Sequence, residues 1–205
     1  MSRKPDYSKK LVVVGDGGCG KTCLLTVYAQ GRFPEEYVPT VFENMCKVVP
    51  SPLDPGKYVD FSLWDTAGQE DFDRIRPLSY GEADVVVVVF AVNYRPSLGN
   101  VQDKWSPEIS HFIPSVPVLL VGTKIDLRTS IAEIGLMRAQ GTTPITKEEG
   151  EAVAREIGAR AYLECSSRTG QGVAEVFEEA LRLCLKGRRS SSRAADRRKK
   201  KCVVL

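Results

Sequence analysis

The sequence predicts an α/β protein, a three-layer sandwich in which a mostly parallel six-stranded sheet carries helices on both faces. Two apolar runs, 85–92 and 116–121, have the length of strands that are buried on both sides. Segments of helical character separate the strand-like segments, and this alternation is typical of a three-layer arrangement. A glycine-rich turn after the first strand-like run is a third indication, because ligands in such sheets bind beyond the carboxyl ends of the strands.

Local patterns predict each element in turn. A β-branched run ends at Gly15, and turn residues at 50–56 separate two short strands, which we therefore expect to be antiparallel. Thr146 and Glu149 have the spacing of a capping box at the start of a helix. The predicted order is strand 9–14, helix 21–30, strands 47–49 and 59–64, strand 85–92, helix 97–112, strand 116–121, helix 146–158, strand 162–165 and helix 172–186.

The chain of 205 residues fits one domain with a short tail. We divide it into an N-terminal extension (1–8), a domain (9–187) and a basic tail (188–205), and we expect disorder in the Ser-, Arg- and Lys-rich tail. Residues 186–201 hold nine Lys or Arg and one acid, although the whole chain has a net charge of only +3. A slightly acidic body with a basic tail argues against nucleic-acid binding and indicates contact with an anionic surface.

The composition also bears on other classes of protein. No signal peptide is visible, and the longest apolar run is too short to span a membrane. The six cysteines form no CxxC pair and the chain has one His, so we expect neither a zinc site nor a disulfide framework. Most of the cysteines are expected in the core, with Cys202 as the exception.

Residues 15–22 read GDGGCGKT and match the phosphate-binding pattern GxxxxGK[ST] at every fixed position. Glycines let the backbone curl so that N–H groups point at phosphate oxygens, and the following helix N-terminus adds partial positive charge. Lys21 can neutralise the β- and γ-phosphates, and the Thr22 hydroxyl can ligate Mg²⁺. The alternative is a glycine-rich turn that carries Lys-Thr by chance. The predicted phosphate-binding residues are Gly15, Gly17, Gly18, Cys19, Gly20, Lys21, Thr22 and Cys23.

A second motif, TKID at 123–126, follows the strand 116–121. The Asp126 carboxylate can accept hydrogen bonds from both N1–H and N2–H₂ of guanine, whereas adenine would leave it unpaired. The stem of Lys124 can pack over the ring, and Thr123 begins the motif. Alone, TKxD could be a surface turn, but its place at the end of a strand about a hundred residues after the glycine loop favours a base pocket.

These motifs and several longer stretches make the sequence resemble the Rho family within the Ras superfamily of small GTPases. The stretches are GDGGCGKT at 15–22, YVPTVFEN at 37–44, WDTAGQEDFDRIRPLSY at 64–80, TKID at 123–126, ECSS at 164–167 and CVVL at 202–205. The resemblance covers residues 9–187 and includes a Rho-type insert at about 128–141. It implies the small G-protein version of the P-loop NTPase fold, and a switch that cycles between an active GTP form and an inactive GDP form.

The resemblance also implies roles for individual residues. Thr40 would close over Mg²⁺ and the γ-phosphate, Asp65 would hold Mg²⁺ through water, and Gln69 would orient the attacking water. The other implied contacts with nucleotide are Gly68 at the γ-phosphate, Phe33 at the base edge, Tyr37 over the phosphates, the Ser167 N–H at guanine O6, and Ser166 of the same motif. Lys21, Thr40 and Gln69 are thus the predicted catalytic residues, and Thr22, Thr40 and Asp65 the predicted metal residues. Phe33 and Tyr37 as plain loop aromatics, and Gln69 as a surface residue, are the alternatives.

Two departures from the family pattern concern the base pocket. Thr123 stands where most of the superfamily has Asn, a replacement common in the Rho family, and Arg168 follows Ser167 where Lys is usual. The 50–56 loop also looks longer than usual. Since no arginine finger is evident in cis, we expect slow intrinsic hydrolysis and acceleration by an activating protein.

Partners are also implied by the resemblance: exchange factors, activating proteins, dissociation inhibitors, and effector kinases or scaffolds of cytoskeletal and polarity pathways. Apolar residues of the two loops that change with nucleotide state are candidate contacts, with a place in the core as the alternative for each. They are Val38, Val41, Phe42, Phe72, Leu78 and Tyr80.

The C-terminal Cys202-Val203-Val204-Leu205 fits a C-a-a-X box, and its terminal Leu favours geranylgeranylation of Cys202. One lipid anchors weakly, and the adjacent basic cluster supplies a second attraction, so we expect the cytoplasmic face of the cell membrane with a cytosolic pool. A nuclear-import signal is the alternative role of the basic residues. Phosphorylation of Ser190–Ser192 would reduce the charge of the tail.

The sequence leaves two other functions open. An ATP-using P-loop enzyme is opposed by TKID and by the lack of a substrate domain. A module that holds GTP without hydrolysing it is opposed by Gly17 and Gln69, since a bulky residue at the first or loss of the second would be expected in such a protein.

Overall fold

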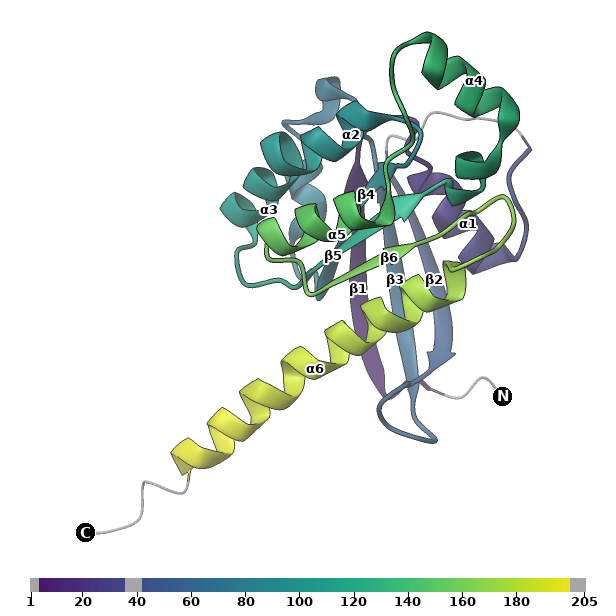
Figure 1. Cartoon of the computed structure of the whole chain (residues 1–205). Coiled ribbons are helices and arrows are strands. Elements are labelled where there is room, and N and C mark those ends of the chain that lie inside the picture. Colours follow the sequence, from purple (N-terminus) through teal and green to yellow (C-terminus); the bar gives the residue numbers. More distant parts are fainter. Residues whose placement is uncertain (1–3, 36–41, 200–205) are drawn as a thin grey trace.

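The computed structural model describes residues 4–35 and 42–199, with the backbone alone from 187 onward. In this part of the chain six strands form one sheet in the order β2-β3-β1-β4-β5-β6 (Figure 1). All neighbours are parallel except β2 and β3, which are antiparallel. The strands are β1 (Tyr7–Gly15), β2 (Phe42–Pro50), β3 (Tyr58–Thr66), β4 (Val85–Ala91), β5 (Val118–Thr123) and β6 (Ala161–Glu164). The predicted fold class is therefore confirmed.

Helices cover both faces of this sheet. The α-helices are α1 (Lys21–Gln30), α2 (Arg95–Asn100), α3 (Ser106–Phe112), α4 (Ile131–Ala139), α5 (Lys147–Glu156) and α6 (Val173–Lys199). A π-helical turn, η3 (Val101–Trp105), joins α2 to α3, and the 3₁₀ turns are η1 (Glu70–Phe72), η2 (Arg76–Tyr80) and η4 (Ile125–Thr129). Helices α1 and α6 pack on one face, and η3, α3 and α5 pack on the other, whereas α4 lies at one end of the molecule (Figure 1).

The alternation of side chains along β1 explains why the sheet has two cores. Leu11 and Val13 point into the cluster beneath α1 and α6, while Val12 and Val14 point into the cluster beneath η3 and α5. Strand β4 is buried along its whole length, as its run of valines predicted. The sheet is therefore held from both sides, and its carboxyl edge has a firm base for the loops that follow.

Several local predictions are confirmed. Thr146 Oγ1 accepts a hydrogen bond from the Glu149 N–H, and a Glu149 carboxylate oxygen accepts one from the Thr146 N–H, so the capping box opens α5. Helix α4 occupies the predicted insert. The antiparallel β2–β3 pair is confirmed and is longer than expected at both ends.

Several predicted boundaries change; the strand expected at 116–121, for example, is β5 at Val118–Thr123. Strand β1 begins at Tyr7, inside the predicted extension, because Tyr7 and Ser8 pair with β3. The helix expected at 97–112 begins at Arg95 and contains the π turn just before Pro107, which has no N–H to continue the α-helical bonds. Disorder was expected beyond Gly187, but α6 continues to Lys199, through a segment that lacks proline and holds five Arg and two Ala, residues that favour helices. Of the helices among the described residues, none has the length and apolar character needed to cross a membrane.

Candidate functional site

A hollow in the described surface lies at the carboxyl edge of the sheet, where the loops after β1, β3, β5 and β6 converge. It has two adjoining parts, of about 440 and 170 Å³, which share Gly20, Cys23, Phe33 and Lys124. The larger part is also lined by Gly17, Gly18, Lys21, Thr22, Pro34, Glu35, Glu43, Thr66, Ala67, Gly68 and Gln69. The smaller part is also lined by Thr123, Asp126, Leu127, Ser167 and Arg168.

The glycine loop takes the shape that only glycine allows. Gly18 and Gly20 have φ values of +73° and +86°, and at Gly15 a Cβ would lie 2.2 Å from the Val89 carbonyl oxygen. Helix α1 begins directly after the loop, and no described side chain caps its N-terminus. The first N–H groups of α1 are therefore available to an anion, at the positive end of the helix dipole.

Lys21 lies under this loop and is almost fully buried. Its Nζ donates to the carbonyl oxygens of Gly15 and Asp16, both at 2.8 Å, so the ammonium is held at the floor of the larger part. Burial lowers the pKa of Lys21, and the nearby Asp65 carboxylate opposes that shift. An anion that enters the cavity would therefore stabilise the charged form of Lys21.

Thr22 and Asp65 form the predicted metal position. The Thr22 hydroxyl donates to a carboxylate oxygen of Asp65 at 2.6 Å, at the junction of α1 with the end of β3. Mg²⁺ prefers oxygen ligands, and it is usually held by one or two protein groups together with phosphate oxygens and water. The two side chains supply that donor set beside the phosphate cavity, so the residues present fit the ion. Thr40, the third predicted metal residue, lies outside the described residues.

Gly68 and Gln69 pack against the glycine loop. A Cβ at Gly68 would lie 2.4 Å from both the Gly15 carbonyl oxygen and the Gly17 nitrogen. On the other side of the contact, a Cβ at Gly17 would lie 4.0 Å from Cγ of Gln69. The two loops therefore meet through two glycines, and this contact brings the Gln69 side chain to the larger part of the cavity.

The smaller part is organised by β5 and the loops after β5 and β6. Asp126 lies on its wall with Ser167, and Lys124 takes a left-handed conformation, with φ of 61°, between the two parts. The Thr123 hydroxyl donates to the Cys19 carbonyl oxygen at 2.6 Å and is within 3.0 Å of the Phe90 carbonyl oxygen, so it ties the end of β5 to the glycine loop. Ser166 is buried, and its hydroxyl accepts from the Thr169 N–H within the β6–α6 loop.

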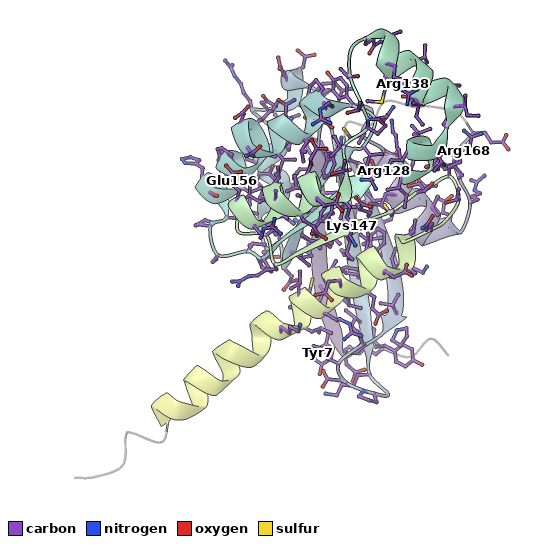
Figure 2. The ribbon with its side chains drawn as sticks, in the orientation of Figure 1. Tyr7, Arg128, Arg138, Lys147, Glu156 and Arg168 are labelled. Carbon is purple, nitrogen blue, oxygen red and sulfur yellow. The ribbon has the colours of Figure 1, made fainter. Side chains whose placement is uncertain are left out.

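Most of the residues predicted for nucleotide contact are thus brought together. Among those described, Gly15, Cys19, Asp65 and Ser166 do not line the cavity, and their contacts with nucleotide or metal stay predictions. Tyr37 and Thr40 lie outside the described residues, as does Cys202. Arg168, whose role the sequence left open, lines the smaller part of the cavity. Figure 2 shows this residue far from Tyr7, which lies at the start of β1.

The candidate partner contacts divide. Leu78 is 81% exposed and Phe42 and Phe72 are half-buried, but Tyr80 is 1% exposed and belongs to the core cluster under η3. The core alternative therefore holds for Tyr80. Val38 and Val41 lie outside the described residues.

Some residues near the site could not be predicted from local sequence motifs. Glu35 and Glu43 line the larger part of the cavity, and Asp16 of the glycine loop accepts hydrogen bonds from Asn100 and from the Trp105 indole. These contacts join segments more than 80 residues apart, so only the folded chain reveals them.

A glycine loop over a buried lysine, a hydroxyl–carboxylate pair whose oxygens suit Mg²⁺ and a carboxylate in the adjoining smaller cavity are the features of a nucleotide-binding protein of the P-loop class. The family model of the Ras family matches residues 10–186. The chain is 51% identical over 202 residues to the GTP-binding protein RHO1 of Saccharomyces cerevisiae, covering 96% of this chain and 95% of that protein. It is 52% identical over 200 residues to the GTP-binding protein RHO1 of Candida albicans, covering 98% and 97%.

It is also 50% identical over 202 residues to the GTP-binding protein rho1 of Schizosaccharomyces pombe, covering 98% of each chain. The chain therefore belongs to the Ras family, and within it to the Rho-type small GTPases.

Proposed function

We propose that this protein is a molecular switch that binds GTP and GDP with Mg²⁺ and hydrolyses GTP slowly to GDP and phosphate. The observation that carries the proposal is the two-part cavity, which has Lys21 at the floor of one part and Asp126 on the wall of the other. A nucleoside triphosphate has this same division between an anionic chain and a flat base. The names of the relatives, all GTP-binding proteins, support guanine as the base.

The phosphate part would act mainly by position and charge, since phosphoryl transfer needs little covalent help from the protein. The loop N–H groups and Lys21 would hold the β- and γ-phosphates. Gln69 would orient a water molecule for attack on the γ-phosphate. Mg²⁺, held through Thr22 and Asp65, would neutralise charge that develops on the phosphate oxygens.

The base part would select guanine. The Asp126 carboxylate would accept from N1–H and N2–H₂, and adenine would leave this partly enclosed carboxylate without donors. Phe33 and Lys124 line both parts and would pack against the base and the sugar. The pair formed by Thr123 with the Cys19 carbonyl would keep the base pocket at a constant distance from the phosphate loop.

The test is nucleotide competition on protein purified with Mg²⁺. GTP and GDP should displace a labelled guanine nucleotide, and ATP should need a concentration roughly 10⁴-fold higher. Asp126→Ala should remove most of this preference, whereas Glu156→Ala, a carboxylate on the exposed side of α5, should preserve it. Equal displacement by ATP and GTP would favour the rival ATP-using enzyme, and binding without phosphate release would favour the rival non-hydrolysing module.

The tail supports a proposal about location. Cys202 would be prenylated, and the basic residues of the tail would bind anionic lipid at the cytoplasmic face of the cell membrane, with a cytosolic pool. Cys202→Ser should shift the protein from the membrane fraction to the supernatant, and the intact mass should lose one prenyl group. An unchanged partition would refute the anchor.

The partners that we propose are exchange factors, activating proteins, dissociation inhibitors, and effector kinases or scaffolds of cytoskeletal pathways. Leu78, which is exposed on the turn η2 after Gln69, is a candidate contact for them. Capture with protein loaded with a non-hydrolysable GTP analogue or with GDP should separate effectors from regulators.

A further inference from the structure

Arg76 has an unusual position for a charged side chain. It lies on the segment after Gln69, yet it is 0% exposed. Its Nε donates to the Ala67 carbonyl oxygen at 2.9 Å, and its Nη2 donates to the Gln69 carbonyl oxygen at 3.1 Å. The two carbonyls belong to the residues on either side of Gly68, so one guanidinium holds the backbone that carries Gln69.

Acids on two elements balance the buried charge. Arg76 Nη1 lies 2.9 Å from Glu108 on α3, and Nη2 lies 2.6 Å from Asp73 on its own segment. Glu108 is only 13% exposed and also accepts a hydrogen bond from the Tyr80 hydroxyl. Lys104 approaches Asp73 at 3.0 Å from the side of η3. A buried arginine with each of these partners is tolerated, whereas loss of one partner would leave an uncompensated charge.

Trp105 connects this arginine to the phosphate loop. The Arg76 guanidinium carbon lies 4.6 Å from the centre of the Trp105 ring. The indole Nε1 of the same residue donates to Asp16 at 2.7 Å, and Asn100 donates to the other carboxylate oxygen of Asp16, also at 2.7 Å. One helical rod, residues 95–112, therefore contacts the phosphate loop and the Gln69 segment together.

The π turn η3 lies at the centre of this rod. Trp105 is its last residue and Glu108 follows it by three positions. A π turn rotates the side chains after it relative to a regular α-helix, and such turns often occur at functional sites. Here Trp105, at the end of the turn, meets both Asp16 and Arg76, and Glu108, after the turn, meets Arg76.

We propose that Arg76, held by Glu108 and Trp105, is a positioning residue for hydrolysis: it fixes the carbonyls of Ala67 and Gln69 and so keeps the Gln69 side chain beside the phosphate loop. The inference rests on the proposed function, because it assigns Gln69 to the attacking water. We call Arg76, Glu108 and Trp105 the Arg76 clamp. The planar fork of arginine reaches both carbonyls and both acids at once, and the single ammonium of lysine cannot do so.

The clamp acts through Gln69, so its effect depends on that side chain. In the wild-type background, Arg76→Lys should lower the single-turnover rate of GTP hydrolysis by about 10- to 100-fold, because a displacement of about 1 Å in a catalytic group has effects of this size. GDP affinity should change by less than about threefold, since the phosphate and base contacts remain. Glu108→Gln should lower the rate by a smaller factor, because it keeps the size of the side chain and removes its charge.

The decisive measurement is a double-mutant cycle with Gln69→Leu, followed over hours on protein preloaded with GTP. If Arg76 works through Gln69, Arg76→Lys and Glu108→Gln should have almost no further effect on the residual rate of the Gln69→Leu protein. The same fractional loss in both backgrounds would overturn the proposal and leave Arg76 with a structural role only. Should Arg76→Lys fail to fold by circular dichroism, the Glu108→Gln arm alone decides.

Arg74→Ala is the matched control, because Arg74 is exposed on the same segment two residues away, and its hydrolysis rate should stay within about twofold of the wild type. Failure of the proposed function would look different: the wild-type protein itself would release no phosphate from GTP.

Discussion

Replacing Gly68 with alanine adds one methyl group at the contact between the Gln69 segment and the phosphate loop. That carbon would lie 2.4 Å from the Gly15 carbonyl oxygen, 2.4 Å from the Gly17 nitrogen and 2.5 Å from the Asp16 carbonyl carbon. Each of these neighbours is backbone. No flexible side chain is available to move aside, so the two loops themselves must separate.

The required movement can be estimated. Ordinary carbon contacts lie at about 3.5–4.0 Å, so the segment must move by about 1 Å or more away from the loop. A misplacement of about 1 Å can reduce a catalytic rate about 100-fold, which corresponds to about 2.7 kcal/mol of transition-state stabilisation. Lys21, Thr22 and Asp126 are not part of this contact, and GDP affinity should therefore fall by less than about tenfold.

The assay is single-turnover hydrolysis of preloaded GTP, with fluorescent GDP titration as the measure of binding. Gly81→Ala is the control, because no described atom lies within 4 Å of a Cβ at Gly81 and its φ of −53° suits alanine. A Gly68→Ala protein that hydrolysed GTP within twofold of the wild-type rate would show that the packing of these loops does not place Gln69.

Three further predictions concern stability and thiol reactivity. Burial of Glu164 opposes its ionisation, but hydrogen bonds from Arg128 and Tyr162 outweigh this effect and lower the pKa of Glu164. The ionised carboxylate therefore stabilises the fold fully above the pKa of the unfolded chain, near 4.5. This stabilisation is lost as the pH falls through the lower pKa of the folded protein. Urea midpoints of wild type and Glu164→Gln should accordingly differ at pH 7 and converge below pH 4.5, and a constant gap would contradict this. Gly135 lies inside α4, and no described atom is within 4 Å of a Cβ placed there. Gly135→Ala should therefore raise the free energy of unfolding by about 0.5–1 kcal/mol, measured as a higher Tm. A lower Tm would count against α4 as an ordinary helix. Burial raises the pKa of the Cys165 thiol to about 12, whereas Cys46 is exposed. Peptide mapping after brief alkylation should therefore find Cys46 modified and Cys165 protected, and equal labelling would disprove the burial of Cys165.

Much of the site could be predicted because its chemistry is local in sequence. The phosphate loop is eight consecutive residues, and the glycines at positions 15, 18 and 20 adopt backbone conformations that their lack of a side chain permits. The TKID motif begins at the last residue of β5. The direction of this strand therefore places Asp126 at the carboxyl edge of the sheet. The strands and helices followed from apolar runs, turn residues and one capping box, each of which acts within a few residues.

The remaining features depend on residues that are distant in sequence. Nothing in the segment RIRP at 74–77 distinguishes exposed Arg74 from buried Arg76, because the difference comes from Glu108 and Trp105 on another element. Tyr80 looked as available for contact as Leu78, yet the packing of η2 on α3 buries one and exposes the other. Helix α6 also extends beyond the point at which composition suggested disorder.

Local patterns were enough to assign the class of protein, the two binding motifs and the order of the elements, because turn geometry and side-chain periodicity are short-range properties of the chain. The way in which the phosphate loop, the Gln69 segment and the rod of residues 95–112 meet could be seen only in the folded chain. Burial of an arginine, contact between two glycines and the partners of Asp16 arise when segments up to 89 residues apart come together, and no local pattern records that distance.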